Sequence, residues 1–133
     1  MNEIASIKNP SLSMVCEHAV AGYKNAGKLV QAPAIRKVIE SVIRQKSEHV
    51  AILQPLDSLF PGTAQVLTLE SGSDPENILK SLVVHELAFA EGLDGFSPGL
   101  ANEDERLAVK AVADASRKFA SWAQDHLDLL AMF

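Results

Sequence analysis

Residues 55–74, PLDSLFPGTAQVLTLESGSD, decide the fold of this chain, because they separate two regions that both have helical periodicity. The stretch holds a Pro-Gly pair and a Ser-Gly-Ser run, which favour turns and irregular structure. Alternation of apolar and polar residues over 64–70 predicts a brief extended segment within it. A connection of about 20 residues is long enough to run the whole length of a helix bundle.

Two helices are predicted upstream of this connection, over about 10–30 and 34–54. Apolar residues recur in both at steps of three and four, which is the spacing of one helix face. Asn9-Pro10 supplies a cap and a first helical residue for the first of them, and Ala32-Pro33 ends that pattern and opens the next. The turn between the two helices is short, so they are expected to form an antiparallel hairpin.

Two more helices are predicted downstream, over about 75–91 and 103–131. Asp74-Pro75 is a start signal for the first, which the glycines at 92 and 95 are expected to end. Asn102 and Glu105 have the spacing of a capping box at the start of the second. The apolar face of that last helix recurs without interruption through Ala108, Val112, Ala115, Phe119, Trp122, His126 and Leu129.

The loop lengths predict one all-α domain over residues 1–133. Two antiparallel hairpins joined by one long crossover, 55–74, make the ferritin-like type of four-helix bundle, whereas an up-down-up-down bundle has three short loops. The composition agrees, because 47% of the residues are apolar but only 5% are aromatic. A core of Ala, Val, Leu and Ile favours packed helices over a β-sandwich.

Charge and cysteine content restrict the partners and the compartment. A net charge of −5 argues against nucleic acid, which requires clustered Lys and Arg. No apolar run approaches the length of a membrane span, and the first ten residues lack the apolar core of a secretory signal. Cys16 is the single cysteine, so no intrachain disulfide can form. The sequence therefore predicts a cytoplasmic protein.

Residues 17–53 resemble the first hairpin of rubrerythrin-like proteins and related bacterial ferritin-like domains. Gly22, Tyr23 and Ala26 match the Gly-Tyr and following Ala of those relatives, and Glu48-His49 is echoed by Asp125-His126 in the last helix. The resemblance implies a duplicated helix hairpin and, in the family, a di-iron centre. That centre takes a Glu from each of two helices and a Glu-x-x-His pair from each of the other two.

This chain departs from the ligand pattern of the family. The two Glu-x-x-His positions read Lys46-x-x-His49 and Ala123-x-x-His126, so both bridging carboxylates are replaced. Glu17 is the matching acid of the first helix, but its position lies about 140° from the centre of the apolar face and predicts exposure to water. The family requires four acids at this centre, and Glu86 is the only one of them that is present on a predicted apolar face of this chain. The resemblance therefore implies an eroded metal site.

Four polar residues remain on predicted inward faces: Lys46, His49, Glu86 and His126. A buried charge is costly unless it is paired, so these side chains are expected to meet. One interpretation pairs Lys46 with Glu86 and leaves both histidines neutral. A second places a single zinc or iron ion on His49, Glu86 and His126. A third rotates the helices so that some of these groups are exposed.

The remaining candidates have simpler interpretations. His18 and His85 are predicted to be solvated surface residues, and Cys16 a small buried apolar residue. The last residues, 127–133, carry more apolar side chains than one inward face can use, which is typical of an interface. We therefore expect a non-catalytic protein that acts by self-association or by binding a helical partner protein, with no cofactor. The alternative is a metal-dependent redox or oxygen-handling protein that uses His49, Glu86 and His126.

Overall fold

The computed structural model describes residues 11–59 and 74–132 of the chain. Within these ranges it contains four α-helices and two 3₁₀ helices, with no strand. The helices are α1 (Leu12–Leu29), α2 (Pro33–Leu53), η2 (Gln54–Leu59), α3 (Pro75–Phe96), η3 (Ser97–Gly99) and α4 (Glu103–Ala131). The extended segment predicted over 64–70 lies outside the described residues. The predicted all-α four-helix bundle is confirmed.

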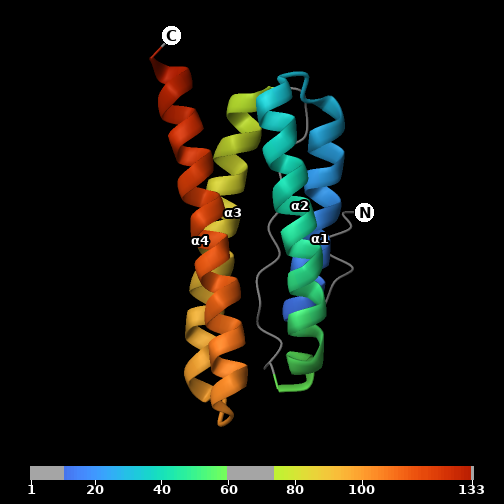
Figure 1. The fold of residues 1–133 in the computed structure, drawn as a ribbon, viewed down its shortest axis with the longest axis vertical. Helices are drawn as coiled ribbons and strands as arrows, with labels where there is room; N and C mark the ends of the chain where they lie inside the picture. Colours follow the sequence, from blue (N-terminus) through green and yellow to red (C-terminus); the bar gives the residue numbers. More distant parts are fainter. Residues whose placement is uncertain (1–10, 60–73, 133) are drawn as a thin grey trace, which may run out of the picture.

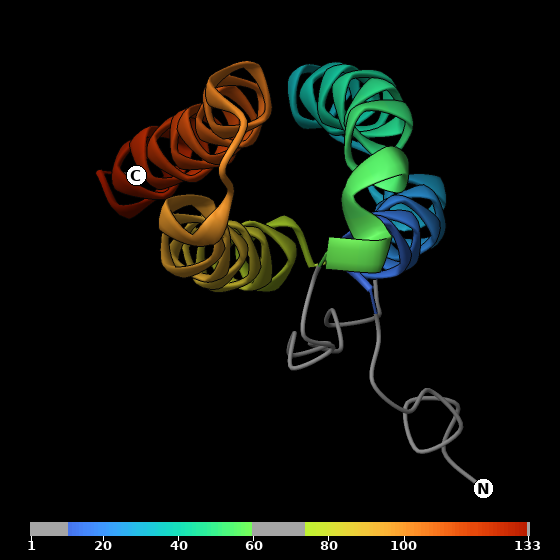
Figure 2. The same ribbon diagram turned by 90° about the horizontal axis from the view of Figure 1, so that it is seen from below.

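The helices are arranged as two antiparallel hairpins, α1 with α2 and α3 with α4 (Figure 1). Helix α2 ends at one end of the bundle and α3 begins at the opposite end (Figure 1). The chain between them therefore has to connect opposite ends, as the length of the connection predicts. In the end-on view, α2 and α3 are diagonally opposed, as are α1 and α4 (Figure 2).

Most helix ends follow their sequence signals. Asn102 accepts a hydrogen bond from the amide of Glu105, and Asp74 accepts one from the amide of Glu76. Helix α1 differs from the prediction, because its cap is Ser11, whose hydroxyl accepts from the amide of Met14. The expected start signal at residues 9–10 lies outside the described residues.

Helix α3 is longer than predicted, since it continues past Gly92 and Gly95 to Phe96. A glycine inside a helix costs only about 1 kcal/mol relative to alanine. Burial of Leu93 in the core and packing of Phe96 against it favour the extra turn.

The start of the predicted crossover is also helical. Helix η2 continues α2, buries Leu56, and brings the carboxylate of Asp57 to the first turn of α1. There Asp57 accepts hydrogen bonds from both the amide and the hydroxyl of Ser13. A carboxylate at a helix N-terminus satisfies free N–H groups and interacts favourably with the helix dipole. This contact fixes the end of the first hairpin.

The apolar core is divided into two clusters along the bundle axis. One fills the end at which α1 begins and includes Val15, Leu53, Leu93 and Val109. The other fills the opposite end and includes Ile39, Leu79 and Phe119, together with other residues of all four helices. None of the described helices is both long and apolar enough to cross a membrane.

Candidate functional site

Five of the buried polar residues lie at the level where the two apolar clusters meet. On α2, α3 and α4 they follow the members of one cluster in sequence and precede those of the other. We call this set the central polar layer: Lys46, His49, His85, Glu86 and Ser116. It is the natural candidate for a functional site, because buried polar groups are expensive unless they are satisfied.

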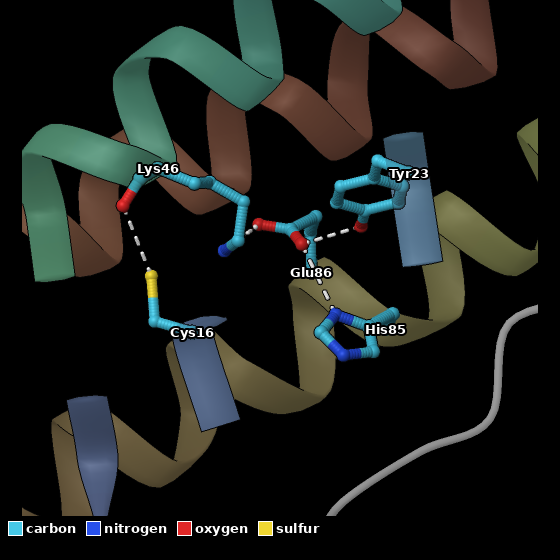
Figure 3. Close-up of polar contacts among 5 residues, drawn as sticks. All are labelled: Cys16, Tyr23, Lys46, His85 and Glu86. Atoms are coloured by element: carbon cyan, nitrogen blue, oxygen red, sulfur yellow. Dashed lines mark hydrogen bonds and ion pairs between the residues drawn. The ribbon is translucent and has the colours of Figure 1, made fainter. Parts of the chain in front are cut away.

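The centre of the layer is an ion pair between diagonally opposed helices. Lys46 Nζ of α2 donates to Glu86 Oε1 of α3 at 2.9 Å, and both side chains are fully buried (Figure 3). The ammonium also lies 4.4 Å from the centroid of the Phe89 ring, within the range of a cation–π contact. Of the three interpretations that the sequence left open, the structure shows the one that pairs Lys46 with Glu86.

The second carboxylate oxygen of Glu86 has two further partners. Tyr23 of α1 donates its hydroxyl to Oε2 at 2.6 Å, and His85 Nδ1 lies 3.1 Å from the same atom (Figure 3). An ionised carboxylate only accepts hydrogen bonds, so His85 Nδ1 carries its proton. The rings of Tyr23 and His85 meet edge to face, with centroids 6.0 Å apart. Glu86 is therefore satisfied by groups from three helices.

These contacts keep Glu86 ionised inside the bundle. Burial pushes its pKa upward, but the charge of Lys46 and the hydrogen bonds from His85 and Tyr23 together outweigh burial and lower the pKa to about 2. Burial and the neighbouring Glu86 charge raise the pKa of Tyr23 well above 10. Tyr23 therefore stays protonated as a donor. The charge of Glu86 and the proton of Tyr23 are thus both held in place.

Cys16 borders the layer but is not activated. Its thiol donates to the backbone carbonyl of Lys46 at 3.3 Å (Figure 3). Burial raises the pKa of the thiol to about 11, despite the opposing effect of the Lys46 charge. Since the thiolate is the reactive form, this cysteine is not a nucleophile at neutral pH. The prediction of a buried structural cysteine is confirmed.

His49 and Ser116 complete the layer between α2 and α4. Neither His49 Nδ1 nor Ser116 Oγ has a hydrogen-bond partner among the described residues. The His49 ring stacks on Phe119, with centroids 6.3 Å apart. Burial, followed by the charge of Lys46, lowers the pKa of His49. His49 is therefore a neutral ring in the core, as one of the predicted arrangements requires.

His126 does not join the other predicted site residues. It lies on the terminal part of α4, half-buried, where its ring packs on Trp122 with centroids 4.4 Å apart. Its Nδ1 lies 3.2 Å from the carbonyl of Trp122. His126 follows Ser116, the α4 member of the central polar layer, by ten residues, which is about 15 Å along the helix, so it lies near the end of the bundle and away from the layer. Placing His126 in the central cluster was therefore wrong.

The prediction for His85 was also wrong, because this residue is buried and not exposed. It was predicted to be solvated, yet only 3% of it is exposed. Its neighbour Glu86 is buried as well, because α3 packs against α4 on one side and presents Glu86 to Tyr23 of α1 on another. A buried face this wide includes two adjacent residues. Glu17 is exposed, as predicted.

The proposed metal triad is not assembled. In residues 11–59 and 74–132, no three His, Cys, Asp or Glu side chains are grouped so that they could hold a metal ion. At the positions where the family resemblance implies bridging carboxylates stand an ammonium group, Lys46, and a methyl group, Ala123. An ammonium repels a cation and cannot ligate it, so these residues do not fit a di-metal centre.

Comparison with known proteins supports the fold and gives no information on activity. No protein family matches the chain, and no curated protein matches it. A hypothetical protein from Pyrococcus furiosus has a similar structure, with a TM-score of 0.70 and 18% sequence identity over 97% of this chain and 94% of that chain. At this identity the likeness establishes a shared fold alone.

Proposed function

We propose that this chain is a ferritin-like protein without a catalytic centre, which works by binding a second copy of itself. The two-hairpin topology supports the ferritin-like assignment, as do the matches at Gly22, Tyr23 and Ala26. The central polar layer supports the absence of catalysis. Its carboxylate is saturated by three donors, and its lysine stands where a bridging ligand would be needed.

The observation that carries the proposal is the exposed apolar end of α4. Leu129, Leu130 and Met132 are 52%, 43% and 78% exposed. The seven residues by which α4 exceeds α3 correspond to about 10 Å of helix. In Figure 1 this end of α4 extends beyond the neighbouring helices. We call residues 125–132, the last seven residues of α4 and the C-cap residue Met132, the α4 overhang. Clustered exposed apolar side chains typically mark a protein interface.

The alternative, a metal-dependent redox protein, receives no comparable support. Its three ligands would be His49, Glu86 and His126. His126 lies in the α4 overhang and packs on Trp122 instead. A cytoplasmic location remains part of the proposal, because Cys16, the single cysteine, is a buried free thiol.

The test is the mass of the chain in solution, measured by light scattering after gel filtration. The parent should associate, and Leu129→Ser/Met132→Ser should reduce the apparent mass toward that of the 14.3 kDa chain. A matched control is Met14→Ser/Leu107→Ser, which replaces two exposed apolar residues elsewhere in the bundle. If both double variants change the mass equally, the α4 overhang has no special role and the proposal fails.

A further inference from the structure

A groove of about 410 Å³ lies between α1 and α2, near the end at which α1 finishes and α2 starts. Its lining includes Gly27, Ile39 and Ile43, which we call the apolar floor. A Cβ added at Gly27 would come within 3.3 Å of Ile39 Cγ2, so glycine allows the two helices to approach closely here. Three cations, Lys24, Lys28 and Arg36, line the groove beside one acid, Glu40. We call it the basic groove.

The cations of the basic groove are available to a partner. Lys24, Lys28 and Arg36 are all exposed, and no carboxylate among the described residues forms an ion pair with them. By contrast, Lys80 and Arg117 are paired with acids on the surface of the α3–α4 hairpin. An exposed ion pair with a partner would therefore not have to displace an existing one.

The α4 overhang has the complementary chemistry. Asp125 and Met132 are each three or four residues from both Asp128 and Leu129, so the four side chains lie within about 100° of one another around the helix axis. All four are exposed. Asp125 has no described partner, and Asp128 accepts only a hydrogen bond from Gln124. The face therefore combines two acids with two apolar side chains, while the groove combines three cations with an apolar floor.

We propose that the α4 overhang of one copy binds in the basic groove of a second copy. This inference rests on the proposed self-association and names its two surfaces. Leu129 and Met132 cover the apolar floor, and Asp125 and Asp128 face Lys24, Lys28 and Arg36. In a twofold-symmetric dimer each copy gives its overhang to the groove of the other, so the contact forms twice. Charge complementarity of this kind fixes the choice of surface and weakens as salt is added.

A charge exchange between two variants tests the pairing. Variant A is Lys24→Glu/Lys28→Glu, which makes the groove acidic, and variant B is Asp125→Lys/Asp128→Lys, which makes the overhang basic. Each variant alone places like charges together, so its self-association should weaken by about tenfold or more. In an equimolar mixture of A and B, both contacts join opposite charges. Sedimentation velocity should therefore show that mixing restores association.

The control is Lys110→Glu/Lys118→Glu, which makes the same change of charge at two exposed lysines of α4 outside both surfaces. It should associate as the parent does, and circular dichroism should show that A and B remain folded. Self-association of A and B at the parent's level overturns the inference, and so does a mixture that stays dissociated. If Leu129→Ser/Met132→Ser still dissociates the parent in those cases, the proposed function stands and only the groove is wrong. A parent that never associates overturns both.

Discussion

Lys46 Nζ and Glu86 Oε1 lie 2.9 Å apart across the diagonal of the bundle, and neither side chain reaches solvent. Tyr23 and His85 occupy the other oxygen of the same carboxylate. One buried charge pair thus ties α1, α2 and α3 together between two apolar clusters. Such a pair is costly to form and more costly to break, because removal of one partner leaves the other charge buried and alone.

Replacement of Lys46 by methionine should destabilise the protein by about 3–5 kcal/mol, because Glu86 loses its counter-charge. Urea unfolding at neutral pH measures the loss. The double variant Lys46→Met/Glu86→Gln should recover part of it, since no unpaired charge then remains. Lys37→Met, at an exposed position of the same helix, is the control. A cost below about 1 kcal/mol for Lys46→Met would place this lysine outside the core.

Replacement of Lys46 by glutamate recreates the Glu-x-x-His spacing with His49 and sets two carboxylates side by side. Like charges at this distance raise the pKa of one carboxyl in the folded state. The free energy of unfolding of the variant should therefore decrease as the pH rises above the ordinary pKa of a glutamate, about 4.3. If the layer is a former metal site, zinc or ferrous iron should raise the melting temperature of this variant and leave the parent unchanged. Arg44→Glu, at an exposed position of α2, controls for the change of charge. A Lys46→Glu variant whose stability responds neither to pH nor to metal would contradict the interpretation of the central polar layer as an eroded metal site.

Acid should weaken the bundle through Glu86. Its pKa is lowered from 4.5 to about 2 in the folded protein, so the unfolded chain binds more protons between these values. Stability is therefore fully present above about pH 4.5 and is lost as the pH falls toward 2. Glu86→Gln should be less stable at neutral pH and should lose this part of the pH dependence. Parallel stability curves for parent and variant, measured by urea unfolding at each pH, would exclude Glu86 as the source.

Protonation of His49 should cause a second decrease in folding stability, at a less acidic pH than that of Glu86. Its pKa lies below the usual 6.5 in the folded state, because burial and the charge of Lys46 disfavour its protonated form. The stability that comes from keeping the ring neutral is present above about pH 6.5 and is lost as the pH falls below it. His49→Phe preserves a ring against Phe119 but removes the proton-binding group. The stability of this variant should fall less than that of the parent over the first pH unit below 6.5, and a slope as steep as the parent's would contradict this assignment.

The sequence predicted the four helices, although not all of their ends, and one of its three interpretations of the inward polar residues was the central pair. Helix α4 spans the predicted 103–131, because its cap and its uninterrupted periodicity agree. The Lys46–Glu86 pair followed from the cost of burying either charge without a partner. Tyr23 was noted for its match to the ferritin-like relatives, and its hydrogen bond to Glu86 was missed. A tyrosine in a face of small aliphatic residues does carry a signal, since a buried hydroxyl requires a partner.

The two misplaced histidines show where periodicity stops being informative. The stripe of α4 continues through His126, but nothing in that stripe reveals that α4 is longer than the helices beside it. His85 and Glu86 lie about 100° apart on α3, and only the packing of that helix on two sides decides that both are buried. Helix length relative to neighbours and the width of a buried face are tertiary properties. Neither can be read from one helix alone.

Sedimentation equilibrium of the unmodified chain tests the central claim most directly. The account predicts a mass that rises above 14.3 kDa with concentration and falls again as salt weakens the contact between the α4 overhang and the basic groove. A mass that stays at the monomer value from micromolar to near-millimolar concentration, at low and high salt alike, would contradict it.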